Sequence, residues 1–153
     1  MNKFKWFKNQ VPDNLKVTQI YGIAFSDDGR ILLRIDDGKY KLTGGHPEKS
    51  ETFEETLKRE FIEEVNISLK DVYYLGYLLV TENDKEQYAQ VRMIAKIDKI
   101  GEQKPDIDNG KIYDRKLVSV EKVKEYLNYN DIAGNDMIDD AIILAKQKYK
   151  MII

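Results

Sequence analysis

The chain of 153 residues contains no cysteine, only three prolines and a single histidine. Without cysteine it forms no disulfide, carries no thiolate nucleophile and builds no zinc site from cysteine ligands. This composition is compatible with the reducing cytoplasm, where we expect the protein to reside. No stretch rich in proline and glycine divides the chain, and its length is typical of one domain. We therefore expect a single domain over residues 1–153.

The sequence also lacks a basic excess and a long apolar run. Its 25 Lys and Arg residues against 27 Asp and Glu residues give a formal net charge of −2 and a pI of about 5.6. This balance argues against a dedicated nucleic-acid binder but leaves room for a small anionic substrate, because a bound metal supplies local positive charge. The longest apolar stretch, residues 73–80, is too short to cross a bilayer, and residues 1–10 do not resemble a signal peptide. We expect no membrane partner.

Alternating apolar residues and short turns predict strands over most of the first two thirds of the chain. Strands are expected at 17–25, 30–35, 39–42, 73–81, 88–97 and 114–119. Asp-Gly pairs predict the tight turns before and after the second of these strands. A loop is expected over 98–112, and helices over 120–127 and 135–150. The expected fold is α/β (α+β), a mixed β-sheet flanked by helices.

A helix is predicted to begin near Ser50 or Thr52 and to end at Asn66. Thr52 and Glu55 have the spacing of a capping box, in which each side chain bonds the other residue's backbone. Apolar residues recur every four positions and give the helix a stripe for the core, at Phe53, Leu57, Phe61 and Val65. Asparagine tolerates the left-handed conformation that commonly ends helices, so Asn66 is a suitable last residue.

The opposite part of this helix carries Glu60, Glu63 and Glu64 on one face. Residues three and four positions apart are neighbours on a helix, and like charges at that spacing repel each other. A chain that clusters carboxylates in this way usually places a cation between them. Ligands that are all oxygen favour a hard ion, with Mg²⁺ first and Mn²⁺ second.

Residues 45–67 resemble the signature of the Nudix (MutT-like) hydrolases. That pattern is Gly-x5-Glu-x7-Arg-Glu-apolar-x-Glu-Glu-x-Gly-apolar, and the chain meets it with Gly45, Glu51, Arg59, Glu60, Phe61, Glu63, Glu64 and Ile67. Asn66 replaces the family's second glycine, which is a mild departure because both residues accept positive φ. Thr43 also stands where many relatives have proline. The signature covers 23 of the 153 residues and is specific.

The resemblance implies a Nudix-type α/β/α sandwich and a metal-dependent pyrophosphohydrolase that cuts a diphosphate or polyphosphate linkage in a nucleoside derivative. It implies metal ligands at Glu60, Glu63 and Glu64 and at the backbone carbonyl of Gly44. Arg59 and Glu51 correspond to a supporting pair that holds the helix and the loop in register. The resemblance leaves open which carboxylate accepts the proton from water, and it is compatible with a homodimer.

Three residues outside the acidic face are weaker candidates for contact with a nucleotide substrate. Tyr40 precedes the paired glycines and could stack on a base, and Arg92, which shares a strand face with Gln90, could meet a phosphate. His46 lies at a variable position of the signature, so we interpret it as a loop residue with a substrate contact rather than as the catalytic base. For each of these side chains a surface or core-edge position is the simpler explanation.

Two further features stay open at the level of sequence. An additional acidic ligand is common among relatives, and the candidates fall in two loops, namely Glu82, Asp84 and Glu86 in one and Asp106, Asp108 and Asp114 in the other. Residues 3–8 alternate lysine with aromatic residues, and we expect an edge strand or a packed arm there rather than a membrane or nucleic-acid contact.

Other classes of function are weighed against the enzyme. One is a non-catalytic nucleotide or nucleotide-sugar sensor, which the intact acidic residues disfavour. Another is an isoprenoid diphosphate isomerase, whose chemistry resembles a cysteine-dependent proton transfer and which the absence of cysteine nearly excludes. The leading prediction is the hydrolase, with its nucleotide substrate unnamed.

Overall fold

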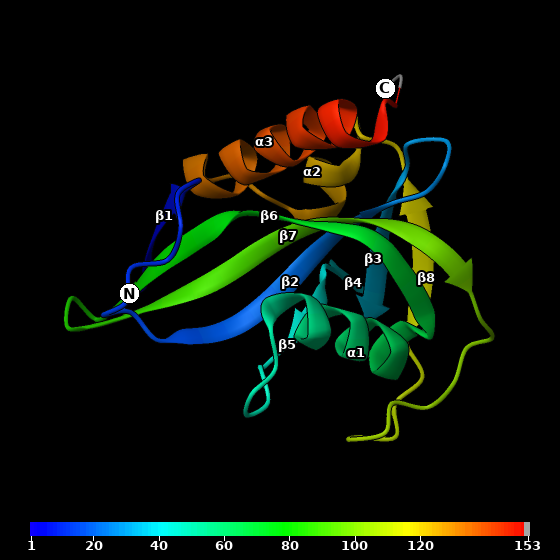
Figure 1. Ribbon diagram of the computed structural model, residues 1–153, viewed down its shortest axis with the longest axis horizontal. Helices are drawn as coiled ribbons and strands as arrows, with labels where there is room; N and C mark the ends of the chain where they lie inside the picture. The colour runs from blue at the N-terminus through cyan, green and yellow to red at the C-terminus, as the bar shows by residue number, and fades with distance from the viewer. Residues whose placement is uncertain (152–153) are drawn as a thin grey trace.

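The computed structural model describes residues 1–151, and in it a mixed β-sheet lies between helices on both faces (Figure 1). The sheet order is β1-β6-β7-β2-β3-β4, while β5 pairs with β2 and β8 pairs with β3. The strands are β1 (Lys3–Phe7), β2 (Val17–Phe25), β3 (Ile31–Asp36), β4 (Lys39–Lys41), β5 (Thr43–Gly45), β6 (Ile67–Glu82), β7 (Glu86–Ile100) and β8 (Asp114–Val118). The helices are α1 (Phe53–Val65), α2 (Val123–Leu127) and α3 (Ile132–Tyr149).

The centre of the sheet is the parallel pair of β2 and β7, in which Tyr21 lies opposite Arg92. Every other strand pair is antiparallel among the residues described. On its other edge β2 pairs with β3 only at Phe25, and then with β5 at Ile20–Gly22. The sheet therefore forks at this edge of β2, and the glycines of β5 are brought beside Tyr21.

Two hydrophobic cores fill the space between the sheet and the helices. The core under α1 contains Leu57, Phe61 and Val65 from the helix, packed against alternate residues of β2 and β7. The core under α2 and α3 takes the other face of the same strands and includes Met137 and Ile138. Figure 1 shows α1 on one face of the sheet and α2 and α3 on the other. This arrangement confirms the predicted mixed sheet with flanking helices.

The ends of α1 follow the prediction closely. Thr52 is the N-cap residue, and the capping box with Glu55 is complete, with bonds of 3.1 and 2.9 Å. At the other end Asn66 has φ 52° and ψ 49°, in the left-handed region. The apolar stripe of the helix faces the core, and Glu60 is buried where the helix meets Gly45. The local sequence therefore determines where this helix starts and stops.

The predicted boundaries differ most in β6 and β7. The sequence predicts strands at 73–81 and 88–97. In the structure β6 already begins at Ile67, and β7 extends to Ile100. Register shifts between Lys70 and Tyr73 interrupt the alternation, and Asp71 has a positive φ of 49°. Such bulges break the period of two on which the prediction depends. The long helix also starts at Ile132, three residues before its predicted start.

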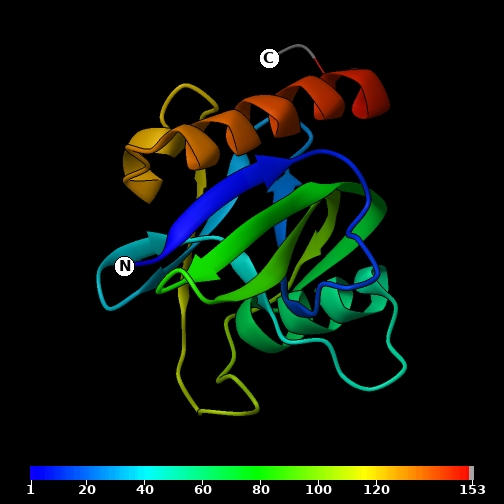
Figure 2. The same ribbon diagram turned by 90° about the vertical axis from the view of Figure 1, so that its left-hand side faces the viewer.

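Residues 3–8 supply the expected edge strand, since Lys3 pairs with Thr81 and Phe7 with Tyr77. In Figure 2 this strand passes directly beneath α3. Among residues 1–151 no helix is long and apolar enough to cross a membrane.

Candidate active site

Arg59, in the middle of α1, is the centre of an ion-pair network between the helix and the loop that precedes it. Its Nε and Nη2 donate to the two carboxylate oxygens of Glu51, at 2.7 and 3.0 Å. Its Nη1 donates to Glu60 at 2.8 Å and to Glu63 at 3.1 Å, and Nη2 also reaches the carbonyl oxygen of His46 at 2.9 Å. A planar guanidinium presents five donors in a fixed fork, which suits this number of acceptors. Arg59 thus holds the loop and the helix together.

Glu51 fastens the loop from the other side. Its carboxylate accepts the backbone N–H of Glu48 at 2.8 Å and the hydroxyl of Thr56 at 2.8 Å, in addition to Arg59. The hydrogen bond from Arg59 is the largest influence on this carboxyl, and its pKa is lowered from 4.5 to about 2. Two hydrogen bonds between Arg59 and Glu51 thus connect the helix to the loop.

Glu64 differs from the glutamates bonded to Arg59, because one of its carboxylate oxygens has no hydrogen-bond partner among the residues described, although its side chain is only 12% exposed. Arg34 lies nearby, with its Nε 3.2 Å from that oxygen, but the two atoms are not aligned for a hydrogen bond. Burial raises the pKa of Glu64 to about 8, against the opposing effect of Arg34, and the neighbouring Glu60 and Asp106 raise it further. Among the residues described, Arg34 is the one basic residue paired with this carboxylate, and no hydrogen bond joins the two.

The paired glycines of β5 approach two different elements, Gly45 the acidic helix and Gly44 the strand β2. A Cβ atom on Gly45 would lie 2.5 Å from the carboxyl carbon of Glu60, and one on Gly44 would lie 2.0 Å from the carbonyl oxygen of Ile20. Neither position has room for a side chain. Glycine is therefore needed where the strand meets Glu60, which is itself 9% exposed.

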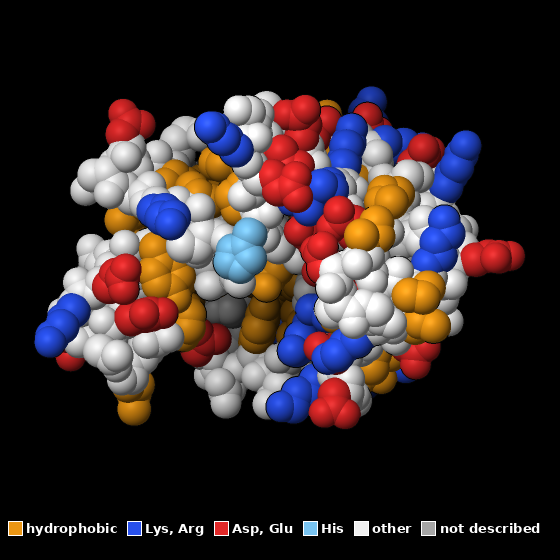
Figure 3. All heavy atoms as spheres, turned by 90° about the horizontal axis from the view of Figure 1, so that it is seen from below, with side chains coloured by type: hydrophobic (Ala, Val, Ile, Leu, Met, Phe, Trp, Pro, Cys, Tyr) orange, Lys and Arg blue, Asp and Glu red, His pale blue; other side chains and the backbone are white. Residues whose placement is uncertain are grey.

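These residues surround a cavity of about 460 Å³ on the face shown in Figure 3, where the surface is hollowed beside the sole histidine. Its lining includes the predicted Gly44, Glu60, Glu64, Arg59 and His46. Glu51 and Glu63 do not line it and contact Arg59 instead. Within residues 1–151 no three His, Asp or Glu side chains converge as a ready metal cluster, because Arg59 lies between Glu60 and Glu63.

The donor set nevertheless suits a hard divalent cation. Acidic residues outnumber basic ones in the lining of the cavity, which contains the acidic side chains Asp36, Glu48, Glu60, Glu64, Asp106 and Asp108 against Arg34 and Arg59. All of these donors are oxygen atoms, which Mg²⁺ and Mn²⁺ prefer. The unpartnered oxygen of Glu64 is an acceptor that a cation would satisfy.

The loop between β7 and β8 supplies acids that the sequence could not choose between. Asp106 is 6% exposed and lines the cavity together with Asp108, and the Asp106 side chain accepts the backbone N–H of Asp108 at 2.8 Å. By contrast, Glu82 binds the Tyr88 hydroxyl and Asp84 pairs with Lys3, both away from this cavity. Of the two candidate loops, only the one at 106–114 reaches the site.

Sequence reasoning missed several residues of the site. Arg34, Asp36 and Tyr113 all line the acidic cavity, and the Arg34 guanidinium lies 4.5 Å from the centre of the Tyr113 ring. The isolated arginine in the apolar run of β3 was the available signal. The candidate substrate residues Tyr40 and Arg92 line a neighbouring cavity instead of this one.

The layered fold places a cavity lined mainly by carboxylates and backbone at the fork of the sheet. The family model described as the NUDIX domain matches residues 18–138. This match spans most of the chain, so the chain belongs to the NUDIX family and is a hydrolase that acts on pyrophosphate bonds.

Solved structures agree on the fold. The chain is similar to the Bacillus subtilis pyrophosphohydrolase BsRppH, solved as a point mutant, with 20% identity, a TM-score of 0.70 and coverage of 91% of this chain and 89% of that one. A MutT described with Aliivibrio salmonicida and Vibrio cholerae shares 18% identity and a TM-score of 0.61, covering 84% and 98%. A NUDIX hydrolase from Nitrosomonas europaea shares 20% identity and a TM-score of 0.62, covering 87% and 90%. A search of curated proteins returned no match.

Proposed function

We propose that the protein is a Mg²⁺-dependent hydrolase that cleaves a diphosphate or polyphosphate linkage in a nucleoside derivative, with Mn²⁺ as an alternative metal. The observation that carries this proposal is Glu64, a largely buried carboxylate that has an oxygen without a hydrogen bond among the residues described and lines a cavity with an excess of acids. Removing such a charge from water is costly unless a cation compensates it. Two of the similar structures are described as a pyrophosphohydrolase and a NUDIX hydrolase, which supports the same activity.

The metal would be held by Glu60, Glu63 and Glu64, with the Gly44 carbonyl as a further oxygen ligand and Asp106 as an added acid from the β7–β8 loop. When bound, the cation neutralises phosphate charge and acidifies water. Arg59 and Glu51 are positioning residues, because they fix the loop on the helix that carries the carboxylates. A carboxylate of the cavity accepts the proton of the attacking water, and the linkage is cut between two phosphorus atoms.

The test compares wild type with Glu64→Gln, which preserves shape and removes the charge. Release of nucleotide and phosphate would be measured over triphosphates, ADP-ribose, nucleotide-sugars and dinucleoside polyphosphates, with Mg²⁺, with Mn²⁺ and with a chelator. We expect one substrate class to be hydrolysed only with metal, and the variant to lose at least about a hundredfold in kcat/KM. Mg²⁺ should raise the melting temperature of wild type more than that of the variant.

Glu54→Gln is the matched control, since Glu54 lies on the same helix but pairs with Lys58 at 2.9 Å on the exposed side. This variant should keep wild-type activity. Full activity of Glu64→Gln would show that the ligand assignment is wrong. Tight binding of one nucleotide without any turnover would instead identify a sensor.

A further inference from the structure

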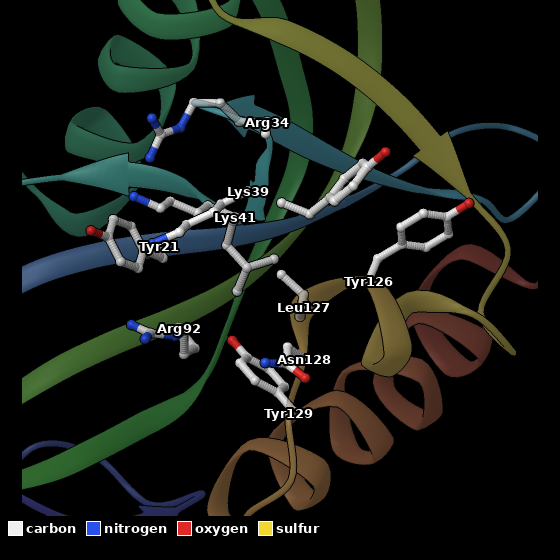
Figure 4. A pocket seen from close by; sticks show the side chains of 12 residues that line it. Tyr21, Arg34, Lys39, Lys41, Arg92, Tyr126, Leu127, Asn128 and Tyr129 are labelled. Carbon is white, nitrogen blue, oxygen red and sulfur yellow. The ribbon is translucent and has the colours of Figure 1, made fainter.

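A second cavity of about 590 Å³ lies beside the acidic one, and the two share Tyr21 and Arg34 in their lining (Figure 4). Its charged residues are all basic, namely Arg34, Lys39, Lys41 and Arg92. No Asp or Glu within residues 1–151 lines it. Four tyrosines complete the wall, Tyr21, Tyr40, Tyr126 and Tyr129. Positive charge next to aromatic faces is suited to a planar ligand that also carries negative charge.

Arg92 is the unusual group in this cavity, because it is 5% exposed and pairs with no carboxylate in the described part of the chain. Its guanidinium lies 4.8 Å from the centre of the Tyr21 ring, and Figure 4 shows it between Tyr21 and Tyr129. It donates only to the Val91 carbonyl at 3.3 Å and to the Gln90 side chain at 3.2 Å, while Nε has no partner among the residues described. The buried charge is left without a counterion.

A buried charge without a partner is costly, so its presence at a cavity wall indicates a ligand of opposite charge. The guanidinium fork matches the oxygen atoms of a phosphate group. On β4, Lys41 lies 3.6 Å from Asp36, while Lys39 forms no ion pair among residues 1–151. Both lysines are exposed at the cavity, and they add to the attraction for an anion.

We infer that this basic aromatic pocket, formed by Tyr21, Tyr40, Arg92 and Tyr129 with Lys39 and Lys41 at its rim, binds a phosphate group of the substrate that lies outside the linkage being cut. The tyrosine rings take the adjoining base. The inference rests on the proposed function, since it takes the acidic cavity as the place of cleavage. It narrows the substrate to nucleoside diphosphate derivatives with an additional phosphate, such as a phosphorylated ribose.

The experiment measures binding without turnover, because its ligands contain no diphosphate linkage. Calorimetry on the full chain without metal would compare adenosine 3′,5′-bisphosphate and adenosine 2′,5′-bisphosphate with AMP, and the guanosine compounds with GMP. We expect a bisphosphate to bind about ten- to a hundredfold more tightly than the monophosphate. Arg92→Gln should bring this ratio close to one, and Lys39→Gln should lower it. Lys99→Gln, an exposed lysine outside the pocket, is the control and should leave it unchanged.

Equal binding of bisphosphates and monophosphates by wild type would overturn the inference. So would an Arg92→Gln variant that keeps the ratio but loses a preference between guanine and adenine, because the arginine would then contact a base. If Arg92→Gln does not fold, the double variant Lys39→Gln/Lys41→Gln at the exposed rim provides the test. An unchanged ratio of bisphosphate to monophosphate affinity in that variant would contradict the inference.

Failure of the proposed function would look different. A preference for bisphosphates with no hydrolysis of any diphosphate substrate would contradict the proposed hydrolase activity but would agree with the assignment of the pocket. Metal-dependent hydrolysis without a preference for bisphosphates would contradict only the inference that the basic aromatic pocket binds an additional phosphate.

Discussion

Charge compensation divides the carboxylates of the site into two kinds. Glu51, Glu60 and Glu63 accept hydrogen bonds from Arg59. Glu64 has only an unaligned arginine nearby. Charge-assisted hydrogen bonds stabilise the folded chain, whereas an incompletely compensated buried acid favours a bound cation. Among the proposed ligands, we therefore expect Glu64 to respond most to metal, while Glu51 maintains the loop on the helix.

Glu51→Gln tests the supporting pair. The folded pKa of about 2 lies below the ordinary 4.5, so the carboxylate stabilises the fold above about pH 4.5 and this contribution is lost as pH falls toward 2. We expect the variant to be destabilised by about 1–2 kcal/mol near neutral pH, and the difference from wild type to shrink between about pH 5 and pH 3. Urea unfolding at several pH values measures it. A difference that does not change with pH would contradict the ion-pair explanation.

At the scale of elements, α1 joins the two ends of the site. Its N-terminal cap lies next to Glu51, and its C-cap residue, Asn66, contacts the segment that leads to Asp106. The Asn66 side chain donates to the Glu102 carbonyl at 2.8 Å, and a Cβ on Gly101 would lie 2.4 Å from its amide nitrogen. Asn66 is therefore more than a left-handed cap, because it also ties the end of the helix to the β7–β8 loop.

Substitutions at Asn66 separate these two roles. Glycine accepts the left-handed conformation but loses the side-chain bond, so Asn66→Gly should cost about 1 kcal/mol. Asn66→Ala loses the bond and also places a Cβ in the left-handed region, so it should cost about 2 kcal/mol. Thermal unfolding of both variants would show whether Asn66→Gly is more stable than Asn66→Ala. If Asn66→Gly equals wild type in stability, the hydrogen bond to Glu102 contributes nothing measurable.

At the scale of the whole molecule, the first strand and the last helix are connected across the fold. The Trp6 indole N–H donates to Asp140 on α3 at 2.8 Å, a contact between residues 134 positions apart. The Trp6 ring also covers Gly76, where a Cβ would lie 2.7 Å from the ring. This contact joins α3 to the edge strand of the sheet, and the local sequence around either residue could not predict it.

Asp140→Ala should destabilise the protein by about 1–2 kcal/mol, because it leaves a partly buried indole N–H without an acceptor. Asp140→Asn keeps an acceptor oxygen and should cost less. Asp139→Ala is the control on the same helix, since Asp139 only pairs with Lys124 on the surface, and it should cost less than about 0.5 kcal/mol. Urea unfolding followed by circular dichroism and by the fluorescence of the single tryptophan would rank the three. If Asp140→Ala and Asp139→Ala lower the free energy of unfolding equally, the hydrogen bond between Trp6 and Asp140 does not stabilise the fold measurably.

The sequence by itself determined what depends on near neighbours. The caps of α1, its apolar stripe, the spacing of Glu51 from Arg59 and the family signature all lie within residues 45–67, and the structure has the caps, the stripe and the ion pair where they were predicted. Strands were found wherever the alternation was unbroken. The strand ends were missed where bulges interrupt β6, because periodicity carries no information across a register shift.

Only the tertiary structure decided which distant residues share a cavity. Arg92 lies against Tyr21 because β2 and β7 pair in parallel in one register, and Arg34 reaches Glu64 because β3 leaves β2 at the fork beside α1. The choice of the loop containing Asp106 over the one containing Glu82 follows from where the chain returns after β7. Such contacts depend on sheet order and crossover path, which no single segment encodes.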